Sequence, residues 1–86
     1  MDIDVDKIRT VTQKIWVDVL KAEVDDTTDF FDVGGHSFLA TKIIALMDDA
    51  LPMRTPVTTI FDHPRFDEFL AVVVAQSPVA QATPAP

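Results

Sequence analysis

The sequence predicts an all-α fold: a small four-helix bundle with three longer helices, one short helix and a long loop between the first two. Two observations support this prediction. Apolar residues recur at helical spacing in three segments, and the two glycines and six prolines fall between or after those segments. The length of 86 residues also suits a single domain with a modest hydrophobic core.

The first predicted helix covers about residues 4–21. Its apolar side chains and one threonine lie on one side at 3.6-residue spacing: Val5, Ile8, Val11, Thr12, Ile15, Trp16 and Val19. Asp2, Asp4 and Asp6 lie at the start of this helix, where negative charge favours the positive end of the helix dipole. They do not form a calcium loop, because Lys7 stands where such a loop needs glycine.

Residues 22–35 form a long predicted loop that is rich in aspartate and threonine. A loop of this length in so small a domain needs anchoring. We therefore expect at least one of the rings of Phe30 and Phe31 to enter the core, with Val24 as a further anchor.

The second predicted helix runs from Ser37 to Ala50. Gly34 and Gly35 precede it, and their backbone freedom, including positive φ, allows a sharp bend into the helix. The predicted buried stripe consists of Leu39, Ala40, Ile43, Leu46, Met47 and Ala50. Phe38 lies on the opposite, polar face, where an aromatic ring forgoes burial unless something covers it.

A stiff link bracketed by Pro52 and Pro56 precedes a short third helix over residues 57–62. Pro64 is predicted in the first turn of the final helix, whose apolar stripe closes the bundle. That stripe consists of Phe66, Phe69, Leu70 and Val73. We expect the domain to span residues 1–76 and the uncharged, proline-rich residues 77–86 to form a flexible tail or linker.

The composition excludes several classes of function. Fourteen acidic and seven basic residues give a formal charge of −7, which disfavours nucleic acid and anionic lipid and favours partners with basic surfaces. The absence of cysteine excludes disulfides and thiolate chemistry by the chain itself. No apolar run is long enough for a membrane span or a signal sequence, so we expect a cytoplasmic domain. We also expect the isolated domain to be monomeric.

Ser37 is the residue best placed for chemistry, because unpaired backbone N–H groups and the positive dipole end of a helix create a phosphate site there. The same position also suits a simple helix cap. A Ser-His-Asp hydrolase is disfavoured, because the nucleophile elbow lacks its final glycine and the adjacent His36 does not face Ser37. His63 is expected to cap or pack, and two histidines supply no metal ligand set.

Two strings of residues indicate a family. They read F-F-D-V-G-G-H-S-F-L-A-T at residues 30–41 and I-F-D-H-P at residues 60–64. Over about residues 8–74 the chain resembles the peptidyl carrier (thiolation) domains of non-ribosomal peptide synthetases, within the acyl-carrier-like superfamily. The resemblance implies the acyl-carrier type of four-helix bundle and a covalent 4′-phosphopantetheine arm on Ser37. It implies a non-catalytic carrier of aminoacyl or peptidyl thioesters during non-ribosomal peptide biosynthesis.

The resemblance also implies partners and site residues. The expected partners are a phosphopantetheinyl transferase, an adenylation domain or enzyme, and condensation, tailoring or thioesterase domains. The residues expected to shape the approach to the serine are Asp32, Gly34, Gly35 and His36. Those expected to dock partners are Phe38, Thr41 and Val57. The alternative is a helical interaction module in which Ser37 is only a helix cap, because bundle patterning supports both functions equally.

Overall fold

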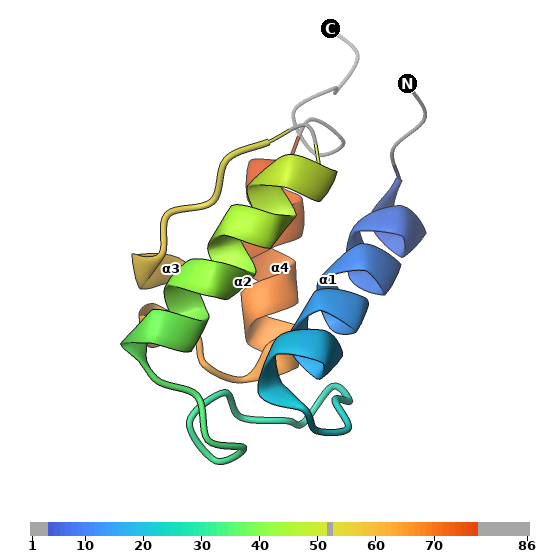
Figure 1. Cartoon of the computed structure of the whole chain (residues 1–86). Helices are drawn as coiled ribbons and strands as arrows, with labels where there is room; N and C mark the ends of the chain where they lie inside the picture. Colours follow the sequence, from blue (N-terminus) through green and yellow to red (C-terminus); the bar gives the residue numbers. More distant parts are fainter. Residues whose placement is uncertain (1–3, 52, 78–86) are drawn as a thin grey trace, which may run out of the picture.

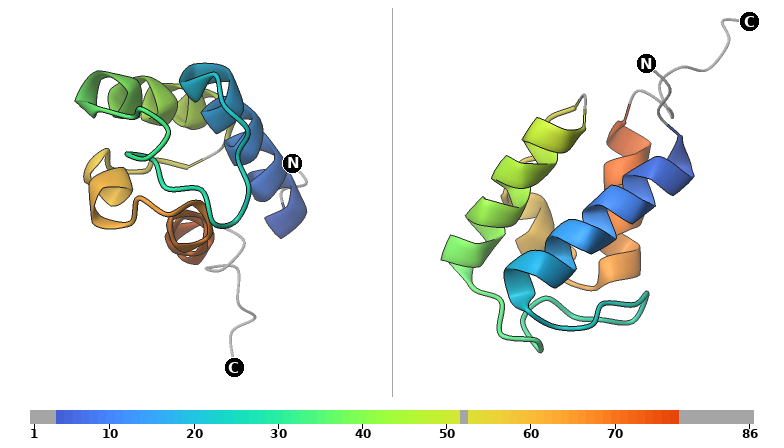
Figure 2. Two further views of the ribbon diagram at one scale, coloured as in Figure 1. Left: turned by 90° about the horizontal axis from the view of Figure 1, so that it is seen from below. Right: turned by 45° about the vertical axis from the view of Figure 1, so that its right-hand side comes forward.

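The computed structural model describes residues 4–51 and 53–77, which form a bundle of α-helices (Figure 1). The helices are α1 (Val5–Leu20), α2 (Ser37–Ala50), α3 (Thr58–Asp62) and α4 (Phe66–Gln76). Helix α1 packs against both α2 and α4, and the short α3 packs against α4 (Figure 2). Within the described ranges there is no β-strand, only an isolated antiparallel bridge between Asp29 and Arg65. The predicted all-α bundle is therefore confirmed.

Helix α1 begins and ends within one residue of its predicted bounds, and local interactions explain both ends. The carboxylate of Asp4 accepts a hydrogen bond from the N–H of Lys7 at 2.7 Å, as an N-cap residue does. Lys21 adopts the left-handed conformation with φ 56° and donates its N–H to the carbonyl of Val17, which ends the helix. Val5, predicted in the buried stripe, lies in the exposed first turn and is 45% accessible.

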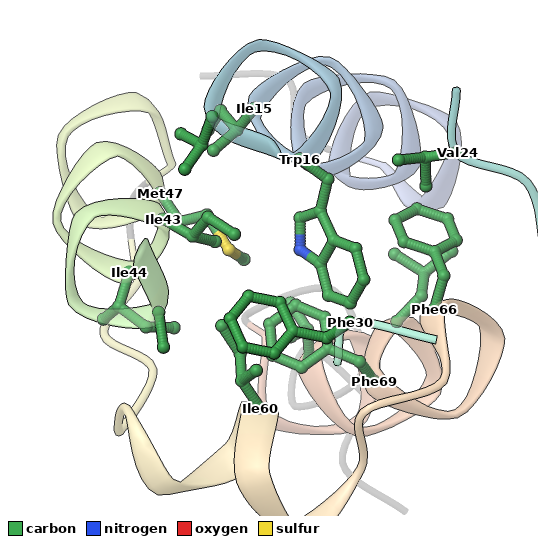
Figure 3. Close-up of a cluster of buried hydrophobic side chains, with 14 of the residues drawn as sticks. Ile15, Trp16, Val24, Phe30, Ile43, Ile44, Met47, Ile60, Phe66 and Phe69 are labelled. Carbon is green, nitrogen blue, oxygen red and sulfur yellow. The ribbon is translucent and has the colours of Figure 1, made fainter. Parts of the chain in front are cut away.

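The core is organised around Trp16, which is fully buried at the centre of the bundle (Figure 3). Its indole contacts three aromatic rings, with centroids at 5.8 Å for Phe30, 5.1 Å for Phe66 and 5.3 Å for Phe69. Phe30 comes from the loop between α1 and α2, and Val24 of the same loop is also buried. The prediction that one of the loop phenylalanines enters the core is confirmed.

Helix α2 has the predicted bounds, but its buried face is turned from the predicted one. The buried residues are Ala40, Ile43, Ile44 and Met47. The prediction was wrong for Leu46, which is 39% accessible, and for Ala50, which is exposed. Figure 3 shows Ile44 on the side of α2 toward Ile60 of α3, which is also buried.

Helix α4 begins at Phe66, so the prediction that Pro64 lies in its first turn was wrong. The reason is pairing with the long loop. The carbonyl of Pro64 accepts the N–H of Phe30 at 2.7 Å, and the N–H of Phe66 donates to the carbonyl of Thr28 at 2.8 Å. These bonds hold the residues before α4 in an extended segment. The predicted stripe of α4 is confirmed, since Phe66, Phe69, Leu70 and Val73 are all buried.

After α4, Ser77 is buried and its hydroxyl donates to the carbonyl of Val74 at 2.6 Å. Residues 78–86 of the predicted tail lie outside the described residues, as do Asp2 and Pro52.

Among the described helices, none combines the length and the apolar character that crossing a bilayer requires.

Candidate functional site

Ser37 is the first residue of α2 and is exposed to solvent. His36, with φ −152° and ψ 178°, occupies the N-cap position before it. Because a serine caps a helix from the N-cap position, Ser37 is one residue beyond the place where its hydroxyl would act as a cap. The backbone carbonyl of Ser37 accepts the hydroxyl of Thr41 at 3.0 Å, which ties the first turn together.

The start of α2 differs from the starts of the other two long helices. Helix α1 has the Asp4 cap and Asp6 in its first turn, and α4 has Asp67 and Glu68 in its first turn. Helix α2 has no acidic residue in its first turn. His36 occupies its N-cap position, and within the described residues its side chain makes no capping hydrogen bond to the helix. The positive end of its dipole and its first N–H groups are therefore open to an anion beside Ser37.

The two glycines before Ser37 serve different structural purposes. Gly34 has φ 92°, a conformation that side-chain-bearing residues rarely adopt, and a Cβ atom there would meet nothing within 4 Å. At Gly35 a Cβ atom would lie 2.5 Å from the carbonyl oxygen of Phe30 and 2.6 Å from its ring. The prediction that the glycines supply positive φ holds for Gly34, whereas Gly35 is required because Phe30 leaves no room for a side chain.

The approach to Ser37 is shaped by an aspartate that the sequence analysis missed. The carboxylate of Asp29 accepts the N–H groups of Phe31 at 2.8 Å and Asp32 at 3.2 Å, which closes a turn. Asp32, predicted to shape this loop, takes part through its backbone, and its side chain is exposed. The signal available in the sequence was an aspartate directly before the two phenylalanines.

Earlier in the same loop, Asp25 closes a second turn. Its carboxylate accepts hydrogen bonds from the hydroxyl of Thr27 at 2.8 Å and the N–H of Thr27 at 2.9 Å. Thr28 adds a weaker hydroxyl contact. The Thr27 hydroxyl, followed by its N–H, lowers the pKa of Asp25 below its ordinary value. The loop is thus held by two aspartates that bind its own backbone.

Two pairs of aromatic rings lie at the surface, one from the residues on either side of Ser37 and one from the loop and α3. Phe38 is 71% accessible, and its ring stacks on that of His36 with centroids 6.4 Å apart. Phe31 of the loop stacks on Phe61 of α3 at 6.1 Å, and both rings are partly exposed. Phe61 is a further exposed aromatic residue that the sequence analysis did not assign to the site.

The remaining predicted residues belong to α2 and to the two ends of α3. Thr41 is exposed one turn along α2 from Ser37, whereas Val57 is half-buried and occupies the N-cap position of α3. His63 ends α3 and donates its backbone N–H to the carbonyl of Thr59 at 2.9 Å, which is a structural role. Within residues 4–51 and 53–77, no group of three or more ligating side chains could hold a metal ion.

The bundle and this site together define a class of protein, a small helical domain that presents an exposed serine at an uncapped helix start. Comparison with known proteins gives the family. The family model described as "phosphopantetheine attachment site" matches residues 11–73. The chain is 37% identical over 78 residues to cyclosporin synthetase simA from Tolypocladium inflatum; the match covers 91% of this chain and a share of the synthetase that rounds to 0%.

Two solved structures share the fold. One, titled "The crystal structure of holo T3CT", is 35% identical with a TM-score of 0.68, covering 84% of this chain and 96% of that one. The other, titled "Non Ribosomal PCP domain", has the same TM-score of 0.68 at 22% identity, covering 84% of this chain and 91% of that one. The second likeness concerns the fold alone.

The chain therefore belongs to the phosphopantetheine attachment-site family. It is a peptidyl carrier, or thiolation, domain of the non-ribosomal peptide synthetase type, and its prosthetic group is 4′-phosphopantetheine. Domains of this family generally carry substrates without catalysis of their own. The chain spans only a very small part of the synthetase that it matches.

Proposed function

We propose that Ser37 carries the 4′-phosphopantetheine arm and that the chain shuttles aminoacyl or peptidyl thioesters between enzymes of non-ribosomal peptide biosynthesis. The observation that carries this proposal is the exposed Ser37 hydroxyl at the start of α2. An arm attached there through a phosphodiester would place its negative charge next to open helix N–H groups. Ser77, the other serine of the chain, is buried and already donates its hydroxyl to Val74.

The attachment reaction requires coenzyme A and a phosphopantetheinyl transferase. A bond forms between Oγ of Ser37 and the phosphorus of the pantetheine phosphate, the phosphoanhydride bond of coenzyme A breaks, and 3′,5′-ADP leaves. The hydroxyl proton passes to the transferase or to solvent. The attached arm supplies a terminal thiol for thioester formation, which a chain without cysteine cannot supply itself. The chain's own part is to present the hydroxyl and to offer the α2 N-terminus to the phosphodiester.

The proposal extends to the partners and the domain boundaries. After modification, an adenylation domain would load the arm, and condensation, tailoring or thioesterase domains would use it. A flexible tether gives one substrate a high effective concentration at several active sites, so weak docking is sufficient. In this proposal the domain spans residues 1–76, residues 77–86 form a linker, and the domain works as a monomer. It would work in the cytoplasm, where coenzyme A is available.

Modification in vitro tests the attachment residue. The folded chain is incubated with coenzyme A and a broad-specificity phosphopantetheinyl transferase, and intact-mass spectrometry follows the product. We expect complete conversion to a species heavier by one phosphopantetheine, no conversion of Ser37→Ala, and normal conversion of the matched control Ser77→Ala. An adduct that persists in Ser37→Ala, or a folded wild-type chain that gains no mass, would contradict the proposal. The second outcome would favour the helical interaction module.

A further inference from the structure

We propose that Phe30 is the positioning residue for Ser37, because it fixes the backbone that leads into α2. This proposal rests on the proposed role of Ser37. Phe30 acts through Gly35, which lies against Phe30 two residues before Ser37.

Phe30 is itself held from two directions. Its ring is fully buried and meets the Trp16 indole of α1 edge-on, with centroids 5.8 Å apart. Its backbone N–H donates to the carbonyl of Pro64, in the segment before α4, at 2.7 Å. A side chain fixed by α1 and a backbone fixed by the α3–α4 connection leave Phe30 little freedom to move.

Gly35 is in turn held by Phe30 through two contacts. The N–H of Gly35 donates to the carbonyl of Phe30 at 2.9 Å, and the Gly35 backbone lies so close to the Phe30 ring that a Cβ atom would be 2.6 Å from it. Residues 30–35 therefore form a short turn, and its last residue, Gly35, is held against its first residue, Phe30. Only His36 separates this closed turn from Ser37, so the position of Phe30 sets the position of the first residue of α2.

The neighbouring Phe31 cannot serve the same purpose, because its ring lies at the surface and stacks on Phe61. Phe69 of α4 provides a matched comparison. Like Phe30 it is fully buried and packs on Trp16, with centroids 5.3 Å apart, but it belongs to α4 and is not part of the turn that leads to Ser37. Replacing either ring by leucine removes similar volume from the same core.

The test compares Phe30→Leu with Phe69→Leu in the full chain. Both variants should have lowered midpoints of urea unfolding, so transferase kinetics are measured where both remain folded. We expect kcat/KM for modification of Ser37 to fall about tenfold or more for Phe30→Leu, because a misplaced reacting group can cost up to about a hundredfold. We expect a change of less than about twofold for Phe69→Leu. The loss should appear in kcat and leave KM little changed, because the outer docking surface is intact.

A second readout does not depend on modification. Amide hydrogen exchange of Gly35 should be faster in Phe30→Leu than in Phe69→Leu, because only the first variant loosens the turn. If Phe30→Leu does not fold, Phe30→Met keeps more of the volume and tests the same contact. Equal rates and equal exchange in the two variants, with the wild type modified normally at Ser37, would overturn the positioning role alone. A wild type that gains no adduct would instead overturn the proposed function.

Discussion

Gly34 and Gly35 are adjacent, and from the sequence both are expected to supply backbone freedom before α2. In the structure Gly34 is required for its positive φ and Gly35 for its close contact with Phe30. Gly34 has φ 92° with open space where a side chain would project. Gly35 has no positive φ, and its missing side chain leaves space for the Phe30 carbonyl and ring. A residue that tolerates positive φ can therefore replace the first glycine better than the second.

This difference predicts two patterns of stability. Gly34→Ala should lower the free energy of unfolding by about 1–2 kcal/mol because of backbone strain, and Gly34→Asn should restore part of it, since asparagine tolerates positive φ. At Gly35, alanine should cost about 1–3 kcal/mol through overpacking, and asparagine should be no better. Urea denaturation of the four variants measures these values. A clear advantage of asparagine at Gly35 would contradict the steric explanation.

At the scale of the elements, local periodicity predicted the helices well but could not orient all of them. The stripes of α1 and α4 are set by residues at helical spacing, and Trp16 and Phe69 lie where that spacing predicts. The buried face of α2 depends on how the rest of the bundle packs around that helix, so burial of Ile44 could not be read from α2 alone. The start of α4 depends on pairing between Pro64 and Phe30, residues far apart in sequence.

The site shows the same division between local and long-range information. The residues at the start of α2 could be predicted, because the glycines, Ser37 and the helical spacing that follows lie in one continuous string. The contact of Gly35 with the Phe30 ring could not, because it depends on how the core holds Phe30. The stacking of Phe31 on Phe61 could not either, because it joins the loop to α3. The role of Asp29 was readable in principle, since aspartates commonly bond to backbone N–H groups two residues on.

Helix α2 presents Phe38 to solvent, and this exposure predicts the outcome of truncation. Phe38→Ala should leave the free energy of unfolding almost unchanged, because the ring is 71% accessible. We expect KM for at least one partner enzyme to rise by roughly tenfold, as when an aromatic interface residue is truncated. Circular dichroism and steady-state kinetics of modification or loading measure the two effects.

Leu46→Ala is the control for this variant, because Leu46 is also a partly exposed apolar residue of α2. It lies about two and a half helical turns after Ser37. Leu46→Ala should leave KM unchanged. Unaltered kinetics of Phe38→Ala with a transferase and with each loading or transfer enzyme would remove Phe38 from the docking surface and leave Thr41 and Val57 as the residues to test.

For the whole molecule, the loop between α1 and α2 that leads to Ser37 packs into the same hydrophobic core as the helices. Trp16 of α1 contacts Phe30 of the loop and Phe66 of α4. Arg9 of α1 forms an ion pair with Asp26 of the loop, and its guanidinium lies 5.9 Å from the centroid of the Phe66 ring. These contacts join α1, the loop and α4 at one end of the bundle, so the loop gains its order from the core.

This arrangement predicts that the loop and the helices unfold together. Trp16 fluorescence and far-UV circular dichroism should give the same urea midpoint, as expected of a small domain without a stable intermediate. The Gly35 amide, bonded to a carbonyl that is anchored in the core, should exchange with about the same free energy as amides in the middle of α1. The exposed amide of Phe31, bonded only to the Asp29 side chain, serves as the fast-exchanging reference. If Gly35 exchanged at a much lower free energy than α1, the turn would open independently, and Ser37 would be presented by a loop that the core does not hold.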